Sequence, residues 1–276
     1  MKRLIAPVDF SDLSVNAARY AAHLAAWLNI DLELLHIVQL PVVYGEVPMP
    51  IGEYDSIQAE ATSQLNQLAT ELDNLLQGQL IVHQQVKVGS PVYELMQLSK
   101  RPDVYAMVMA THGAGSVERF FIGSTTQSLV EEADCPVIVV PAGYAFKKPQ
   151  RLALASDLKQ VTHRTPEAGI RQLVADFGAQ LDILHADPDF GEFEPAAMQE
   201  EVMLETMFSD LHPKFRFLHS GEPAASLARY AEENGYDMLI TLPHQRSLLE
   251  SLFSQKHTGK IIRQAHLPVC VIRCRQ

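Results

Sequence analysis

The residues best suited to chemistry are a glycine and two hydroxyl side chains at the expected start of a helix. Gly123, Ser124 and Thr125 open a helical pattern that runs to Glu132. The first amide groups of a helix lack acceptors within it, and the helix dipole favours an anion there by ~0.3–1 kcal/mol. Glycine lets a ligand approach the backbone, and hydroxyls supply further donors. The pattern predicts a phosphate-binding site.

Other chemistry is not indicated by spacing. The segment lacks the Gly-x4-Gly-Lys-Ser/Thr pattern of a Walker A loop, and no Gly-x-Gly-x-x-Gly turn follows the first expected strand, which disfavours a Rossmann dehydrogenase. His244, His257 and His266 do not have the spacing of metal ligands, and no pair of acids is placed as a catalytic dyad. We therefore assign no metal ligands and no catalytic residues.

Alternating strand and helix patterns position the phosphate-binding segment. Helical spacing is expected over 15–28, 57–76 and 123–132, with a further helix opened by Pro91. Short apolar runs predict five strands, over Arg3–Val8, Asp31–Val38, Leu80–Val88, Val104–Ala110 and Pro136–Val140.

The same order of elements occurs twice. Residues 151–157 match 3–9, and residues 181–185 match 32–36. Residues 267–272 match 135–140 at a smaller offset, so the second copy is about seventeen residues shorter in its middle. We expect two domains, over 1–146 and 151–276, joined by the linker 147–150.

Buried strands alternating with helices predict an α/β fold of two tandem, doubly wound, five-stranded parallel sheets. Ligands of such sheets bind beyond the carboxyl ends of the strands, where the strand order reverses. Asp9 follows the first strand, so it is a candidate ligand contact. Asp9 could instead cap the next helix, although Ser11 or Asp12 is the better cap and would leave Asp9 free.

These motifs resemble the universal stress protein family, of the adenine-nucleotide alpha-hydrolase-like fold, and its tandem members in particular. The resemblance rests on residues 7–14, 34–38, 111–113, 123–124 and 135–140. ATP-binding members carry Gly-x2-Gly-x9-Gly-Ser/Thr. Gly113, Gly123 and Ser124 fit this pattern, whereas Ala110 replaces its first glycine and puts close approach of the ribose in doubt.

The resemblance implies ATP, with or without Mg²⁺, as the ligand of the first domain. Asp9 would accept a hydrogen bond from the adenine amino group, with Ala110 beside the ribose. Arg119 could add charge near a phosphate. Pro7 and Val8 would border the base and ribose, Ile37 and Val38 would wall the base, and the phosphates would be held by Gly113, Gly123, Ser124 and Thr125.

The second copy has lost the phosphate-binding pattern. At the matched positions Leu242 replaces Ala110, and the two glycines and the serine become Gln245, Gln255 and Lys256, although Asp157 matches Asp9. We expect the second domain to serve packing, in an intrachain pseudo-dimer that pairs the apolar last strands of the two halves. Two such chains could also pair again as a homodimer, which the sequence leaves open.

Several residues suit a structural role better than a chemical one. His36 and His185 end the second strand of each copy, where a hydrogen-bonded structural histidine is expected. Cys135 and Cys270 resemble small buried hydrophobes. A methionine cluster in the second half is expected to pack in the core or between domains: Met198, Met203 and Met207.

The bulk composition excludes several classes of protein. A formal net charge of -11 argues against nucleic-acid and anionic-membrane partners. No apolar run approaches the ~20 residues of a membrane span, and Asp9 interrupts any signal peptide. Three cysteines without Cys-x-x-Cys spacing fit a reducing compartment, so we expect a cytoplasmic protein.

The expected function is therefore ATP binding by a cytoplasmic stress-response protein. Two alternatives stay open at this point. The chain could be an interaction module that binds no nucleotide, because Ala110 breaks the motif. It could also be a slow ATPase, although no residue is placed by spacing to position a water for phosphoryl transfer.

Overall fold

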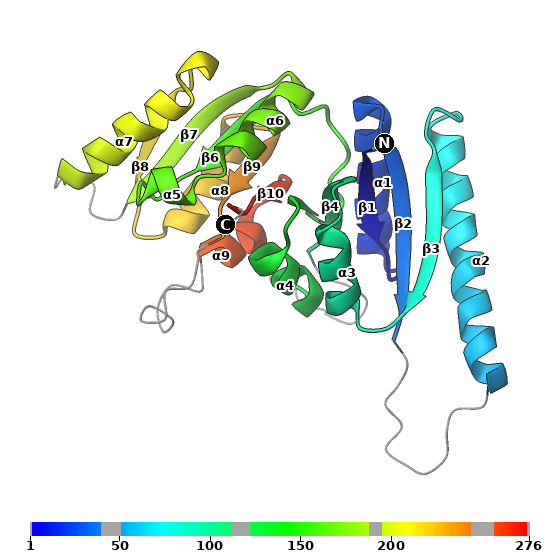
Figure 1. The fold of residues 1–276 in the computed structure, drawn as a ribbon. Helices are drawn as coiled ribbons and strands as arrows, with labels where there is room; N and C mark the ends of the chain where they lie inside the picture. The colour runs from blue at the N-terminus through cyan, green and yellow to red at the C-terminus, as the bar shows by residue number, and fades with distance from the viewer. Residues whose placement is uncertain (1, 40–50, 112–121, 188–194, 244–256, 275–276) are drawn as a thin grey trace, which may run out of the picture.

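The first half of the chain alternates strands and helices as expected (Figure 1). The computed structural model describes residues 2–39, 51–111, 122–187, 195–243 and 257–274. The elements of the first half are β1 (Arg3–Pro7), α1 (Asp12–Leu28), β2 (Asp31–Val38), α2 (Ile51–Leu75), β3 (Val82–Val88), α3 (Pro91–Ser99), β4 (Val104–Ala110), α4 (Ser124–Glu132) and β5 (Val137–Val140).

The second half repeats this order with two changes. Its first helix is split, because the residue before Pro166 is disfavoured in helical conformation. Its second helix has 13 residues against 25 in α2, which accounts for most of the shortening seen in the sequence. The elements are β6 (Arg151–Ala155), α5 (Val161–Arg164), α6 (Glu167–Phe177), β7 (Gln180–Asp187), α7 (Pro195–Met207), the 3-10 turn η1 (Ser209–Leu211), β8 (Phe215–His219), α8 (Pro223–Glu233), β9 (Met238–Thr241), α9 (His257–Gln264) and β10 (Val269–Val271).

The strands of both halves form one continuous sheet. Its order is β3-β2-β1-β4-β5-β10-β9-β6-β7-β8, with parallel pairing inside each half. The last strands meet in antiparallel register, with Cys270 opposite Ile138. The expected pairing of these strands is confirmed. The strands of the second half consequently run opposite to those of the first.

Helices cover both faces of the sheet, and each helical layer spans both halves. One core lies under α1, α2, α5, α6 and α7, and the other lies under α3, α4, α8 and α9. Alternate residues of a strand enter different cores: Leu4 and Ala6 face the first, and Ile5 faces the second. Among the described helices, none combines the length and apolarity needed to cross a bilayer.

The seam between the halves is aromatic on the α1 face. Trp27 of α1 contacts Phe177 of α6 with ring centroids 5.3 Å apart, and the Lys148 ammonium lies 4.9 Å from the Trp27 ring. Tyr20, which is 2% exposed, meets the edge of Phe146 at 5.3 Å. The segment that follows β5 therefore packs against α1.

Two side-chain predictions had different outcomes. Cys135 and Cys270 are buried thiols outside any disulfide, as expected, and burial raises the pKa of the Cys270 thiol. The packing role expected of the methionine cluster was wrong for two members, because Met198 and Met203 are 52% and 46% exposed on α7. Met207 alone of the three packs against the core, because only the face of α7 that carries Leu204 turns toward the sheet.

Truncation of Phe177 tests the seam. Phe177→Ala should lower the free energy of unfolding by about 3–5 kcal/mol, because it removes a ring that is 2% exposed. Trp27 is the single tryptophan of the sequence, so its emission in the native state should shift to longer wavelength. Urea denaturation followed by circular dichroism and fluorescence measures both effects. The control Phe217→Ala removes a ring that is 37% exposed and should cost less. Equal losses of unfolding free energy in the two variants would contradict a stabilising role of the Trp27–Phe177 contact.

Candidate functional site

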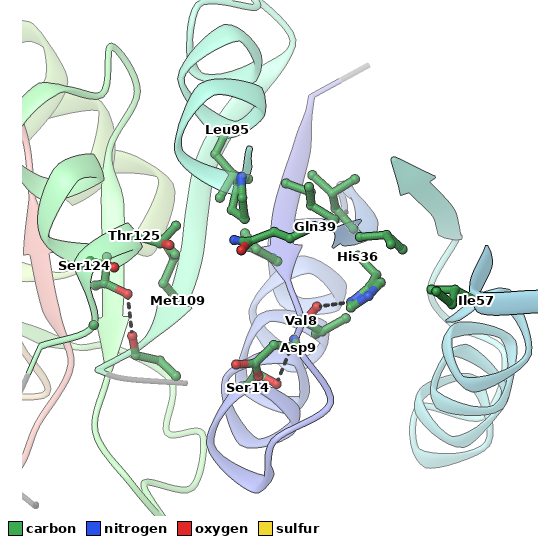
Figure 2. Close-up of a pocket in the computed structure, with 18 residues that line it drawn as sticks. Val8, Asp9, Ser14, His36, Gln39, Ile57, Leu95, Met109, Ser124 and Thr125 are labelled. Carbon is green, nitrogen blue, oxygen red and sulfur yellow. Dashed lines mark hydrogen bonds between the residues drawn. The ribbon is translucent and has the colours of Figure 1, made fainter. Parts of the chain in front are cut away.

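A cavity of about 600 Å³ opens at the carboxyl ends of β1, β2 and β4 (Figure 2). The strand order of the first half reverses at this point, because β1 pairs with β2 on one side and with β4 on the other. The lining residues come from those strand ends and from α1 to α4: Pro7, Val8, Asp9, Ser14, Leu35, His36, Ile37, Val38, Gln39, Ile57, Pro91, Leu95, Met109, Ala110, Gly123, Ser124, Thr125 and Thr126.

The chain between β1 and α1 is held by a closed set of hydrogen bonds. The Ser11 hydroxyl accepts from the Ser14 amide at 3.2 Å, which makes Ser11 the N-cap of α1, as predicted. The Ser14 hydroxyl donates to the Ser11 carbonyl at 3.0 Å and accepts from the Asp9 amide at 3.2 Å. The backbone of Asp9 is thereby fixed to the first turn of the helix.

Asp9 is exposed at the mouth of the cavity. The sequence suggested a carboxylate without local bonds, and the structure shows two bonds to Ser11. Oδ1 accepts from the Ser11 amide at 3.1 Å and from the Ser11 hydroxyl at 2.6 Å. This turn fixes the direction of the carboxylate, and a carboxylate has further acceptor positions for a ligand. The sequence pattern could not reveal this, because Asp-x-Ser occurs equally in a simple cap.

His36 joins the ends of β1 and β2. Its Nδ1 lies 2.8 Å from the Val8 carbonyl oxygen, and its ring lies against Phe10 with centroids 4.5 Å apart. Figure 2 shows the imidazole bridging toward Val8. His185 makes the matched contact in the second half, at 2.9 Å from the Ser156 carbonyl oxygen. The prediction of hydrogen-bonded structural histidines is confirmed.

The other side of the cavity is the N-terminus of α4. Ser124 is exposed and Thr125 is half-buried there, and the preceding Gly123 has the ordinary φ of -59°. The Gly123 amide donates to the Thr111 carbonyl at 2.8 Å. The backbone angles of Gly123 would therefore accept other residues. The amides that follow it, in the first turn of α4, are the ones available to an anion at this helix end.

Thr126 anchors α4 to the strand beneath. Its buried hydroxyl donates to the Ala110 carbonyl at 3.0 Å, and Thr258 makes the same bond to Leu242 at 3.1 Å in the second half. Sequence reasoning missed this pair, although both threonines stand in the first turn of the matched helices. The bond ties the helix N-terminus to the end of β4, so it sets the width of the cavity there.

The structure brings most of the predicted site residues together. Around one cavity lie Pro7, Val8, Asp9, Ile37, Val38, Ala110, Gly123, Ser124 and Thr125. Gly113 and Arg119 fall outside the described residues. The cavity wall formed by helix residues, which include Ile57 of α2 and Leu95 of α3, was not predicted from the sequence. Pro91 was the available signal, because it marked a helix that starts at the same edge of the sheet.

The second half keeps the scaffold of the site in part. Asp157 follows β6 as expected, and Leu242 stands directly after β9, at the position that matches Ala110 in the first half. The predicted replacements Gln245, Gln255 and Lys256 fall outside the described residues.

Removal of the threonine hydroxyl tests the anchor of α4. Thr126→Val keeps the side-chain shape but leaves the buried Ala110 carbonyl without this donor, which should cost about 1–3 kcal/mol of unfolding free energy. The matched Thr258→Val should cost less, because Thr258 is only half-buried. Urea denaturation of both variants measures the costs. Unchanged stability of Thr126→Val would show that the bond does not hold the helix.

Comparison with known proteins agrees with the tandem architecture. A universal stress protein of Mycobacterium tuberculosis is 25% identical over 291 residues, covering 98% of this chain and 96% of that protein. One from Methanocaldococcus jannaschii is 26% identical over 157 residues, covering 54% and 84%. The crystal structure of a universal stress protein from Archaeoglobus fulgidus shares the fold, with a TM-score of 0.68, 16% identity and coverage of 99% and 96%. The model of the Universal stress protein family matches residues 1–141 and 150–273, so the chain is a tandem member of that family.

Proposed function

We propose that the first half of this protein binds ATP and that its occupancy carries a regulatory signal in the stress response. The observation that carries the proposal is that one cavity combines an oriented carboxylate, apolar walls and a helix N-terminus. Its volume of about 600 Å³ falls within the usual range for small-molecule sites, roughly 300–1,000 Å³.

Each part of the cavity suits one part of the nucleotide. Asp9 would accept a hydrogen bond from the adenine amino group, and the strand ends at Val8 and Val38 would border the base. The first turn of α4 would bind phosphate through its amides and the hydroxyls of Ser124 and Thr125. Mg²⁺ bound to the phosphates would offset their charge. Gly113 and Arg119 are further candidates for this end, from the sequence pattern alone.

Ala110 is compatible with this assignment. Ala110 is the last residue of β4, lines the cavity and is 9% exposed. Its carbonyl accepts the hydrogen bond from the Thr126 hydroxyl. A methyl group at this point adds apolar surface beside the ribose, and alanine is the smallest side chain that could replace glycine. The family membership and the net charge of -11 together favour a cytoplasmic protein that acts through a small ligand and other proteins.

Calorimetric titration of Mg-ATP tests the proposal. We expect one site per chain in the wild-type protein. Asp9→Asn keeps an oxygen for the Ser11 bonds but removes the charge, so it should weaken binding about 10- to 100-fold, as expected for a lost bond to a charged group of about 1.5–3 kcal/mol.

The matched control is Asp157→Asn in the second half, which should bind ATP like the wild-type protein. Heat from two sites, or equal losses in both variants, would contradict assignment to the first cavity. Absence of binding by the wild-type protein, together with no ATP retained through purification, would favour an interaction module instead.

A further inference from the structure

The turn after β1 has an unusual backbone conformation in both halves. Phe10 has a φ of 62°, and Leu158 at the matched position has a φ of 51°. Bulky side chains rarely occupy this left-handed region, and they persist there when the surroundings hold them. The repeated conformation shows that the turn is a built feature of the fold and not a local accident of one copy.

In the first half, His36 contacts the residue on each side of Asp9. His36 hydrogen-bonds the Val8 carbonyl at 2.8 Å, which belongs to the peptide before Asp9. The same imidazole lies against the ring of Phe10, the residue after Asp9, at 4.5 Å and an interplanar angle of 31°. The imidazole thus contacts both neighbours of Asp9, the carbonyl of Val8 and the side-chain ring of Phe10.

The second half keeps the hydrogen bond but has no aromatic ring at the matched position of the turn. His185 retains the bond to the Ser156 carbonyl, but Leu158 stands where the first half has Phe10. The aromatic neighbour of His185 is Phe217 of β8, at 6.0 Å and 69°. The contact between the histidine and an aromatic ring of the turn is therefore specific to the first half, whereas the hydrogen bond belongs to the shared fold.

We propose that His36 and Phe10 are positioning residues, which fix the Asp9 carboxylate in the direction needed to accept the ligand's amino group. This inference rests on the proposed function. Phe10 is outside the set of residues that line the cavity, so its effect on binding would pass through His36 and the backbone of Asp9. His36 also lines the cavity, so Phe10 provides the cleaner test.

The experiment measures Mg-ATP affinity by calorimetry on the full chain, beside urea denaturation of each variant. Phe10→Leu installs the residue that the second half uses in the same conformation, so folding should be preserved. We expect Phe10→Leu and His36→Leu each to weaken binding about 10-fold. The double variant should lose little more than the weaker-binding single variant, because both changes release the same turn.

Two controls separate positioning from general damage. Phe10→Tyr keeps the aromatic ring and should bind ATP like the wild-type protein. His185→Leu removes the matched hydrogen bond in the second half, so it should lower stability by about as much as His36→Leu but leave affinity unchanged.

The outcomes distinguish the positioning role of His36 and Phe10 from the proposal that the first half binds ATP. A wild-type protein that takes up no ATP overturns both. Wild-type affinity in Phe10→Leu overturns this proposal alone, and so do fully additive losses in the double variant, because independent contacts add.

Discussion

The last strand of each half is apolar on both faces and needs a partner along its free edge. Val137, Ile138, Val139 and Val140 are all buried, and in an isolated half their strand would end the sheet. An exposed apolar edge invites pairing with another chain. β10 occupies this edge from within the same chain, and the two helical layers then close over the junction. The position of β4, and with it one wall of the cavity, depends on this pairing because β4 lies against β5.

The internal repeat separates what the fold requires from what a ligand requires. The strand-end histidines, the helix-anchoring threonines and the left-handed turn occur in both halves. Features kept in a half where Gln255 and Lys256 replace Gly123 and Ser124 belong to the scaffold. The backbone bond to the aspartate is also repeated, because Asp157 accepts from the Lys159 amide at 3.2 Å as Asp9 does from the Ser11 amide. The Ser11 hydroxyl bond to Asp9, the Phe10 ring and the small residues at the start of α4 have no counterpart in the sequence of the second half, so they are the features that specialise the first.

Most of the fold followed from local pattern. The strand over Asp31–Val38 and the one over Val104–Ala110 were predicted to the residue, because apolar runs between turn residues mark buried parallel strands. The helix expected over 57–76 starts earlier, at Ile51. Met203 was expected to be buried and is exposed, because helical spacing in a sequence does not reveal which face of a short helix packs against the sheet. The side chains around the cavity were harder to predict, since the contact of His36 with the Val8 carbonyl and the wall formed by Leu95 depend on residues far apart in the sequence.

The antiparallel joint between β5 and β10 has a consequence for how the protein could meet other molecules. The carboxyl ends of the first five strands and those of the second five emerge from opposite borders of the sheet. A small molecule held at one border leaves the other border open. The two sets of strand ends therefore form separate surfaces of one protein, so substitutions at one border need not disturb the other.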